Sequence, residues 1–273
     1  MQTYQLLKNL KTLLFVFVST SIIVAGIEDP LEASTQNIKS ARDSSFKSFI
    51  RQVNQNYGKQ YASHVDELFQ ILLKPENAVL SEERPRFLEF DVLKMRETVG
   101  TYQTAIIKNG NMLSVRDKYK ISFTPRERCY IYLFKIETTG KIFPLFPQKE
   151  FSLQTNPLTP NRTHFIPPIK KWLPFKKGYG KEAIIMSAFT KGNPDIERLM
   201  KYFIAFSTKN LPSNKEKAKP VKEIPIVSKG ISGSKKSEER KLQLPFDELA
   251  TFTATEYIWK DSKFVKTLWY KRK

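Results

Sequence analysis

The sequence predicts an α+β fold that is mainly β: an antiparallel β-sandwich-like domain with an N-terminal helical region and one short helix after the core strands. Apolar residues recur every three or four positions before residue 75, and from Arg86 onward they alternate with polar ones. Turn signals then separate many short apolar runs, which is typical of a sandwich. With 273 residues, 40% of them hydrophobic, the chain is long enough to bury a sizeable core.

Residues 1–26 are predicted to be a secretory signal peptide. Lys8 and Lys11 precede an uncharged run of 14 residues that ends in small side chains, which is the order of a basic start, an apolar core and a cleavage site. A membrane-spanning helix needs about 20 apolar residues. We therefore expect cleavage after Gly26 and a periplasmic or extracellular protein with no transmembrane span after cleavage. An uncleaved anchor in the inner membrane is the alternative.

Residues 27–83 are predicted to form the helical N-terminal region. Gly58 weakens the middle of this helix, and Lys74-Pro75 ends it. Its apolar face carries side chains at helical spacing. These are Phe46, Phe49, Ile50, Val53, Tyr57, Tyr61, Val65, Leu68, Phe69, Leu72 and Leu73.

Residues 84–206 are predicted to form the sandwich-like domain. Asn109-Gly110 lies between two apolar runs and predicts a hairpin, because both residue types tolerate positive φ. The run Tyr130–Ile136 is apolar on both faces, so we expect a central strand that packs on both sides. Pro144 in the following strand indicates an edge position or a bulge.

The remainder of the chain is divided by composition. Asn193 and Pro194 predict the start of a helix. Residues 207–243 are rich in Lys, Ser, Pro and Glu, and we expect a flexible segment there because few apolar side chains are available to bury. Residues 244–273 then form a predicted C-terminal hairpin that returns to the sandwich.

Several short motifs in the central block resemble a family of bacterial exported proteins known as domain of unknown function 4384. The motifs are Tyr130-x-Tyr132-x-Phe134-x-Ile136, Gly140, Leu145-Phe146-Pro147, Ile166-Pro167, and Gly180-x-Glu182 before Ser187-Ala188. The resemblance covers about residues 115–188, with Glu137 and Gln148 where the family often has Asp and usually has Asn. It implies a β-rich extracytoplasmic module and brings no established activity. Because Pro147 and Gly140 suit a strand end and a turn, we expect structural roles for this set.

Charge and aromatic residues indicate where a ligand would bind. The chain has 46 Lys+Arg against 27 Asp+Glu, a net charge of +19, which favours anionic partners. The predicted binding surface is the loop with Lys170, Lys171, Trp172, Lys176 and Lys177, since aromatic rings among cations suit stacking and ion pairing. Lys271, Arg272 and Lys273 could extend it. We expect a non-enzymatic module that binds a protein partner or an anionic cell-envelope polymer.

Two other functions are weighed against this one. A hydrolase-type enzyme would have to use Cys129 with His164, the Cys/His pair of the sandwich region. A nucleic-acid-binding protein fits the basic charge, but no motif of that class is present. One cysteine and two histidines argue against a zinc site, and no cofactor is expected.

Overall fold

The computed structural model describes residues 30–74, 84–168, 170–209 and 218–273. The predicted signal peptide, residues 1–26, lies outside them. Residues 45–273 form one compact unit, and the described residues before it, 30–44, are the beginning of the first helix. All contacts discussed below lie within residues 45–273.

The predicted N-terminal helical region is present as α2 (Pro30–Tyr57) and α3 (Lys59–Leu73). Gly58, at a φ of +85°, separates the two helices, so the residue expected to weaken one helix divides it instead. The apolar face of α3 is buried along its length. This face, with Phe49 and Val53 of α2, packs on the β-domain.

One sheet, here called sheet A, has the strand order β11-β12-β1-β4-β7, with β2 beside β1 and β8 beside β4. All its pairings are antiparallel. Its strands are β1 (Arg86–Thr98), β2 (Thr101–Ile106), β4 (Asp117–Pro125), β7 (His164–Ile166), β8 (Leu173–Pro174), β11 (Ile231–Gln243) and β12 (Leu249–Trp259). A short 3-10 turn, η1 (Pro245–Asp247), connects β11 to β12.

The second sheet, sheet B, has the order β10-β13-β9-β5-β6, with β3 running parallel to β13. Its strands are β3 (Met112–Leu113), β5 (Tyr130–Ile136), β6 (Ile142–Phe146), β9 (Gly180–Phe189), β10 (Ser228–Lys229) and β13 (Lys263–Arg272). Strand β6 lies at the edge, and its register against β5 shifts at Leu133/Phe134. The edge position and the bulge that Pro144 indicated are therefore both present.

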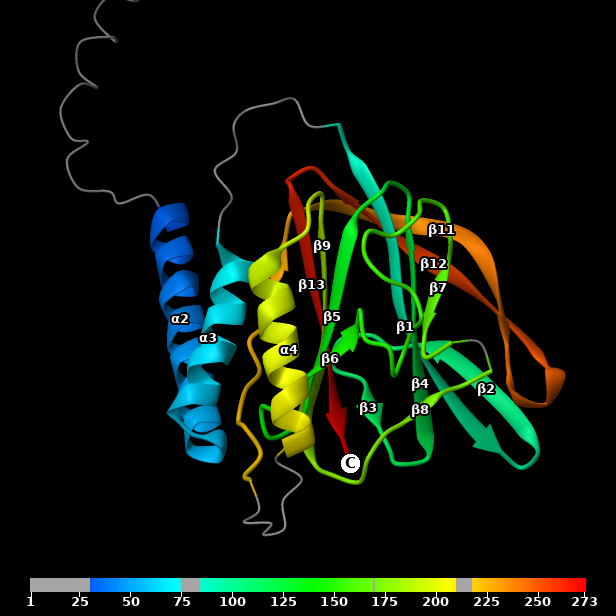
Figure 1. Ribbon diagram of the computed structural model, residues 1–273, viewed down its shortest axis with the longest axis horizontal. Helices are drawn as coiled ribbons and strands as arrows, with labels where there is room; N and C mark the ends of the chain where they lie inside the picture. The colour runs from blue at the N-terminus through cyan, green and yellow to red at the C-terminus, as the bar shows by residue number, and fades with distance from the viewer. Residues whose placement is uncertain (1–29, 75–83, 169, 210–217) are drawn as a thin grey trace, which may run out of the picture. The chain divides into compact units, whose positions relative to one another are not determined.

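Sheet B is the middle layer of the fold, with sheet A on one face and the helices, including α4 (Pro194–Lys209), on the other (Figure 1). Strand β5 shows this directly. Ile131 and Leu133 join the core between the sheets, and Tyr132, Phe134 and Ile136 join the core beneath the helices. The prediction of a central strand buried on both faces is confirmed, as is the sandwich-like fold.

Gly140 holds the β5–β6 turn against the helices. Its φ is +82°, and a Cβ atom at this position would lie 2.7 Å from Val53 Cγ2 and 3.1 Å from Val221 Cγ1. Gly100 is the matched comparison, because its φ is +75° and a Cβ there would meet nothing within 4 Å.

We expect Gly140→Ala to lower the free energy of unfolding by about 2–4 kcal/mol, because a left-handed alanine is strained and overpacking adds to that strain. Gly100→Ala carries the strain alone and should lose about 1–2 kcal/mol. Urea unfolding of both variants checks this. Equal losses would show that the contact with Val53 relaxes without cost.

The prediction of a flexible segment over residues 207–243 is wrong for residues 218–243. Residues 218–227, here called the strap, bury Val221, Ile224 and Val227 beneath the helices. Strand β11 then pairs along β12 from Ile231 to Gln243. This part of the chain is ordered although it has few apolar residues, because the backbone hydrogen bonds between β11 and β12 hold it in place.

Two predicted hairpins are also wrong. The C-terminal strands β12 and β13 do not pair with each other, because β12 joins sheet A and β13 joins sheet B. Asn109-Gly110 does not join a hairpin either: β2 pairs with β1 and β3 pairs with β13. Its partner is β13, since Gly110 N donates to Trp269 O at 3.0 Å and Trp269 N donates to Asn109 Oδ1 at 3.0 Å.

Candidate functional site

The predicted basic-aromatic loop is divided in two by β8. Strand β8 pairs with Lys118 and Tyr119 of β4, which anchors the middle of the loop. On one side, Lys170 is exposed and forms an ion pair with Asp247 at 2.8 Å, and Lys171 is exposed. On the other side, Lys176 and Lys177 lie beside the end of β13, where Arg272 Nη2 donates to the carbonyl of Lys176. The five predicted binding residues therefore do not form one surface.

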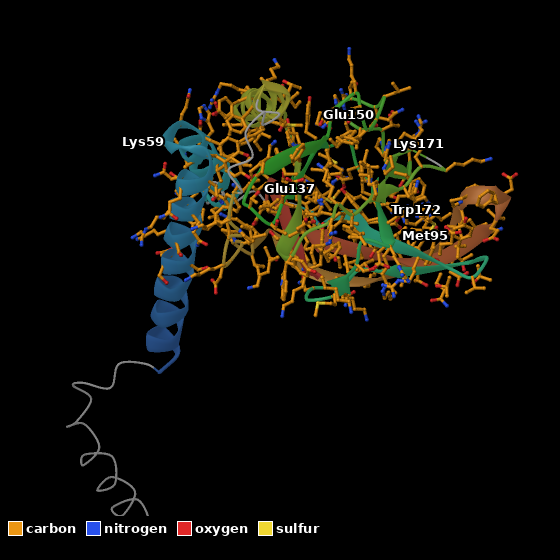
Figure 2. The ribbon with its side chains drawn as sticks, turned by 90° about the horizontal axis from the view of Figure 1, so that it is seen from below. Lys59, Met95, Glu137, Glu150, Lys171 and Trp172 are labelled. Atoms are coloured by element: carbon orange, nitrogen blue, oxygen red, sulfur yellow. The ribbon has the colours of Figure 1, made fainter. Side chains whose placement is uncertain are left out.

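Trp172 lies half-buried on the outer face of sheet A rather than on an open surface. It packs against a small cluster there, and Figure 2 shows it beside Met95, a member of that cluster. Its ring centroid is 5.3 Å from Lys120 Nζ. Lys120 is fully buried, and its Nζ donates to the carbonyls of Pro167 and Pro168 at 3.3 and 3.1 Å. The indole of Trp172 thus covers a buried lysine.

Burial lowers the pKa of Lys120 from 10.5 to about 8. Below pH 8 both the folded and the unfolded chain hold the proton, and the folded state carries the whole penalty of a buried charge. Between pH 8 and 10.5 the unfolded chain binds more protons than the folded one, so stability rises with pH.

We expect the stability of the wild-type protein relative to Lys120→Met to rise by about 2.5 kcal/mol between pH 7 and pH 10. Urea unfolding at a series of pH values measures the difference in unfolding free energy between the two proteins. The contributions of all other titratable groups cancel in this difference. Lys118→Met, at an exposed position of the same strand, is the control and should show no such change. If the difference in unfolding free energy between the wild type and Lys120→Met does not change with pH, Lys120 is not neutral above pH 8.

Several segments that carry exposed cations meet at one end of the sandwich. Figure 1 marks this end by the position of the C-terminal residue. Backbone contacts bring these segments together: Lys273 N donates to Leu113 O, Phe175 N donates to Asp117 O, and Lys271 pairs with Lys181 across β13 and β9. We call this end of the sandwich the basic end and define it by five exposed side chains, which lie on both sides of the sandwich because Tyr119 and Tyr270, the neighbours of Lys118 and Lys271, both face the core between the sheets. They are Arg116, Lys118, Lys177, Lys271 and Lys273.

No carboxylate of the described residues forms an ion pair with any of these five cations. The nearby carboxylates are used elsewhere. Asp117 is buried against Arg96 at 2.7 Å, and Glu137 pairs with Lys176 at 3.5 Å. Arg272, which was predicted to extend the surface, is itself buried and pairs with Glu182 at 3.5 Å. The basic end therefore keeps its charge available to solvent.

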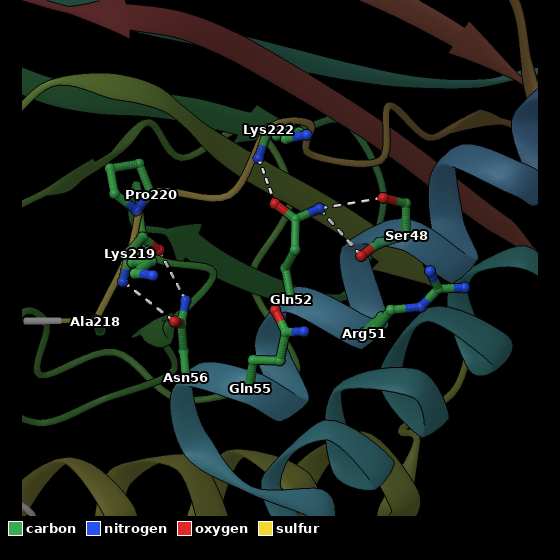
Figure 3. A pocket seen from close by; sticks show the side chains of 9 residues that line it. All are labelled: Ser48, Arg51, Gln52, Gln55, Asn56, Ala218, Lys219, Pro220 and Lys222. Carbon is green, nitrogen blue, oxygen red and sulfur yellow. Dashed lines mark hydrogen bonds between the residues drawn. The ribbon is translucent and has the colours of Figure 1, made fainter.

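A groove between α2 and the strap extends this positive region (Figure 3). Its volume is about 640 Å³, and the described residues of its lining include three exposed cations and no carboxylate. The cations are Arg51, Lys219 and Lys222. The strap reaches the basic end through Pro220, whose Cβ lies 3.6 Å from the Cβ position of Gly180, next to Lys181 in β9.

Side-chain amides of α2 hold the strap in place, as Figure 3 shows. Asn56 donates to Lys219 O at 2.8 Å and accepts from Lys219 N at 3.1 Å. Gln52 Oε1 accepts from Lys222 N at 2.7 Å. These hydrogen bonds fix the backbone of the strap against α2. The side chains of Lys219 and Lys222 therefore extend from an ordered backbone.

Comparison with known proteins gave one result. Residues 113–191 match the family model described as Domain of unknown function (DUF4384). The chain contains a DUF4384 domain. No curated protein and no solved structure matches the chain significantly. No helix in the described part of the chain is long and apolar enough to cross a membrane.

The DUF4384 domain supplies strands to both sheets, from the end of β3 through β9. The strands that complete the sheets lie outside the matched residues: β1 flanks β4, and β13 lies beside β9. The helices that cover sheet B lie outside it too. The DUF4384 domain is therefore the centre of a larger folded unit.

The motif residues of the DUF4384 domain lie mainly in the two cores. Tyr132, Phe134, Gly140, Leu145, Phe146, Pro167 and Glu182 are buried, and Tyr130 and Pro147 are half-buried. Tyr132 also links sheet B to α4, because its hydroxyl donates to Glu197 Oε1 and accepts from Asn193 N, both at 3.0 Å. Asn193 caps α4 as predicted, with its Oδ1 accepting from Ile196 N at 3.1 Å. These placements agree with structural roles.

Glu182 is the centre of a buried polar network that the sequence did not reveal. It pairs with Lys135 at 3.1 Å and with Arg272 at 3.5 Å, and it accepts a hydrogen bond from the Tyr270 hydroxyl at 3.1 Å. All four side chains are buried. The residues come from β5, β9 and β13, which are neighbours only in the folded sheet.

Cys129 and His164, the predicted alternative catalytic pair, are both buried. Burial raises the pKa of the Cys129 thiol to about 12, which keeps it neutral. His164 stacks on Phe123 with 5.4 Å between ring centroids, and burial lowers its pKa. In the described residues no hydrogen bond connects the two side chains. This arrangement lacks the reactive thiolate and the thiol–base contact that a cysteine hydrolase requires.

Proposed function

We propose that this protein is a non-enzymatic module that binds an anionic polymer through its basic end and the adjoining groove. The observation that carries the proposal is the set of five exposed cations at the basic end that have no carboxylate partner among the described residues. Arg51, Lys219 and Lys222 continue the positive surface along the groove. Unpaired cations distributed over an extended surface suit a ligand with repeated negative charges, since each contact displaces a counterion.

The surroundings of these cations support an electrostatic mode of binding. The basic end offers few exposed aromatic rings, Tyr179 being 72% exposed, and Trp172 is packed on the outer face of sheet A. Stacking on rings is therefore a minor contribution. Binding should weaken steeply with salt, because exposed charges are screened within about 10 Å at 0.1 M ionic strength.

Export forms the second part of the proposal and rests on residues 1–26, with Lys8, Lys11 and the uncharged run that follows. In that setting the ligand is an anionic polymer of the cell envelope. Sequencing the N-terminus of the protein recovered from an extracytoplasmic fraction tests this part. A start at Ile27 agrees with it, and a protein retained in the cytosol overturns it.

The charge-reversed variant Lys118→Glu/Lys177→Glu/Lys271→Glu should bind a sulfated polysaccharide about a hundredfold more weakly than the wild type. Each lysine near a strongly anionic surface contributes about 1 kcal/mol. Heparin serves as the probe, with affinity measured over a series of NaCl concentrations.

The control variant is Lys191→Glu/Lys201→Glu/Lys260→Glu, which changes the net charge by the same amount at exposed positions outside the basic end. We expect it to lose much less affinity. If both variants weaken binding equally, the net charge and not the basic end determines binding, and the proposed site is wrong.

A further inference from the structure

A separate cavity of about 340 Å³ opens where the two sheets diverge. The edge strand β6 and β8 form its sides, and the last turn of α4 closes it from the helix layer. Its size lies within the range of small-molecule sites. The cations of the basic end do not line it.

Two buried polar atoms, on residues that line this cavity, have no hydrogen-bond partner in the described part of the chain. They are Gln148 Oε1, from the loop after β6, and Ser207 Oγ, from the end of α4. The Gln148 amide nitrogen donates to Glu150 Oε2 at 3.2 Å, which fixes the orientation of its oxygen. A buried acceptor without a donor is unfavourable. A ligand with hydroxyl or amide hydrogens would supply the missing donor.

Three of the four charged groups in the described lining have an ion-pair partner, and the fourth, Glu150, accepts a hydrogen bond from the Gln148 amide. Lys135 pairs with Glu182 at 3.1 Å, and Lys176 pairs with Glu137 at 3.5 Å. An anionic ligand would meet the carboxylates of Glu137 and Glu150 in the lining. Charge compensation therefore favours a neutral ligand.

A cationic ligand fits no better. The ring of Phe143, which lines the cavity, already has two ammonium groups near it: Lys141 Nζ at 4.8 Å and Lys176 Nζ at 5.2 Å from the centroid. A further cation at this ring would be repelled by both. Phe143 and Phe151 instead offer half-buried ring surface between polar groups.

We propose that this cavity binds a small, neutral, hydroxyl-rich ligand of the saccharide class. The hydroxyl groups of such a ligand both donate and accept. They can satisfy Gln148 Oε1 and Ser207 Oγ while the apolar face of the sugar ring packs on Phe143 or Phe151. The site is distinct from the basic end in place and in ligand charge.

Saturation-transfer NMR with millimolar N-acetylglucosamine, maltose and cellobiose tests the proposal, with choline and acetate as charged comparisons. We expect transfer to at least one neutral sugar, and at least fivefold less to the charged compounds. Gln148→Leu should reduce the sugar signal at least fivefold. Gln154→Leu, a half-buried position in the same loop outside the cavity lining, should leave it unchanged.

The stability of the free protein separates binding from a structural role of Gln148. Gln148 Oε1 has no partner among the described residues, and the Gln148 amide nitrogen makes one exposed bond, to Glu150. Gln148→Leu should therefore keep the wild-type melting temperature while it loses the sugar signal. The charge-reversed basic-end variant should keep the sugar signal, so this proposal and the polyanion proposal fail independently. No transfer to any of the three sugars, or an unchanged signal in Gln148→Leu, overturns the saccharide site.

Discussion

Phe146→Ala should lower the free energy of unfolding by about 3–5 kcal/mol, the range measured for large cavities in protein cores. Phe146 is completely buried in the core between the sheets, and its ring meets Phe123 edge-on with 5.5 Å between centroids. It belongs to Leu145-Phe146-Pro147, a motif of the DUF4384 domain. Truncating it removes the contact between the edge strand β6 and Phe123 of sheet A.

Phe246→Ala is the matched control, because Phe246 is 81% exposed in the β11–β12 turn. Its truncation should change stability by no more than about 0.5 kcal/mol. Urea unfolding measures both variants, and heparin affinity is measured under conditions where Phe146→Ala remains folded. Folded Phe146→Ala that no longer binds heparin would show that the motif belongs to the binding site and not to the core.

The sequence predicted the centre of this fold well, because the pattern of β5 depends on its immediate surroundings. Ile131 and Leu133 alternate with Tyr132, Phe134 and Ile136, and a strand with two apolar faces must be covered on both. The structure supplies sheet A on one face and helices on the other. The sequence did not specify which element would cover which face.

The errors share a physical cause: the partner of each segment lies far away in the chain. Strand β11 has little apolar surface, and besides the ladder to β12 it is held by Glu89 of β1, which binds Arg240 Nη2 at 2.8 Å and Ser237 Oγ at 2.6 Å. Asn109-Gly110 has the residues of a hairpin turn, but it docks on β13. A turn signal predicts that the chain reverses and does not predict which sheet it joins.

The candidate site was predicted only in part for the same reason. Lys176 and Lys177 were identified from their spacing with Trp172, yet the short pairing of β8 with β4 separates the tryptophan from the lysines. The other cations of the basic end lie in or directly beside β4 and β13. The sequence around Lys118 and Lys271 does not predict that they lie near Lys177, because single lysines on strands are ordinary surface residues.

The buried network around Glu182 should be the most sensitive polar feature of the protein. Glu182→Gln keeps the shape of the side chain but leaves Lys135 and Arg272 as buried cations without a carboxylate. Removing one partner of a buried ion pair costs about 3–5 kcal/mol, because the remaining charge is neither solvated nor compensated. We expect a loss of stability of this size in urea unfolding.

Glu127→Gln serves as the control, since Glu127 pairs with Arg84 and Arg86 at 3.5 and 3.7 Å at a site where the Glu127 side chain is 31% exposed. Its loss should stay below about 1 kcal/mol. Adding Lys135→Met to Glu182→Gln removes one of the orphaned cations. The double variant should therefore be more stable than the sum of the single effects predicts, by about 1–3 kcal/mol.

The variants Glu182→Gln and Lys135→Met, together with the double variant that combines them, test the role of the Gly180-x-Glu182 motif. If Glu182→Gln loses several kcal/mol of stability and the double variant recovers part of this loss, the motif neutralises the buried cations that β5 and β13 contribute. If Glu182→Gln is as stable as the wild type, Lys135 and Arg272 reach solvent or other partners, and the motif has a role other than holding the sheet together.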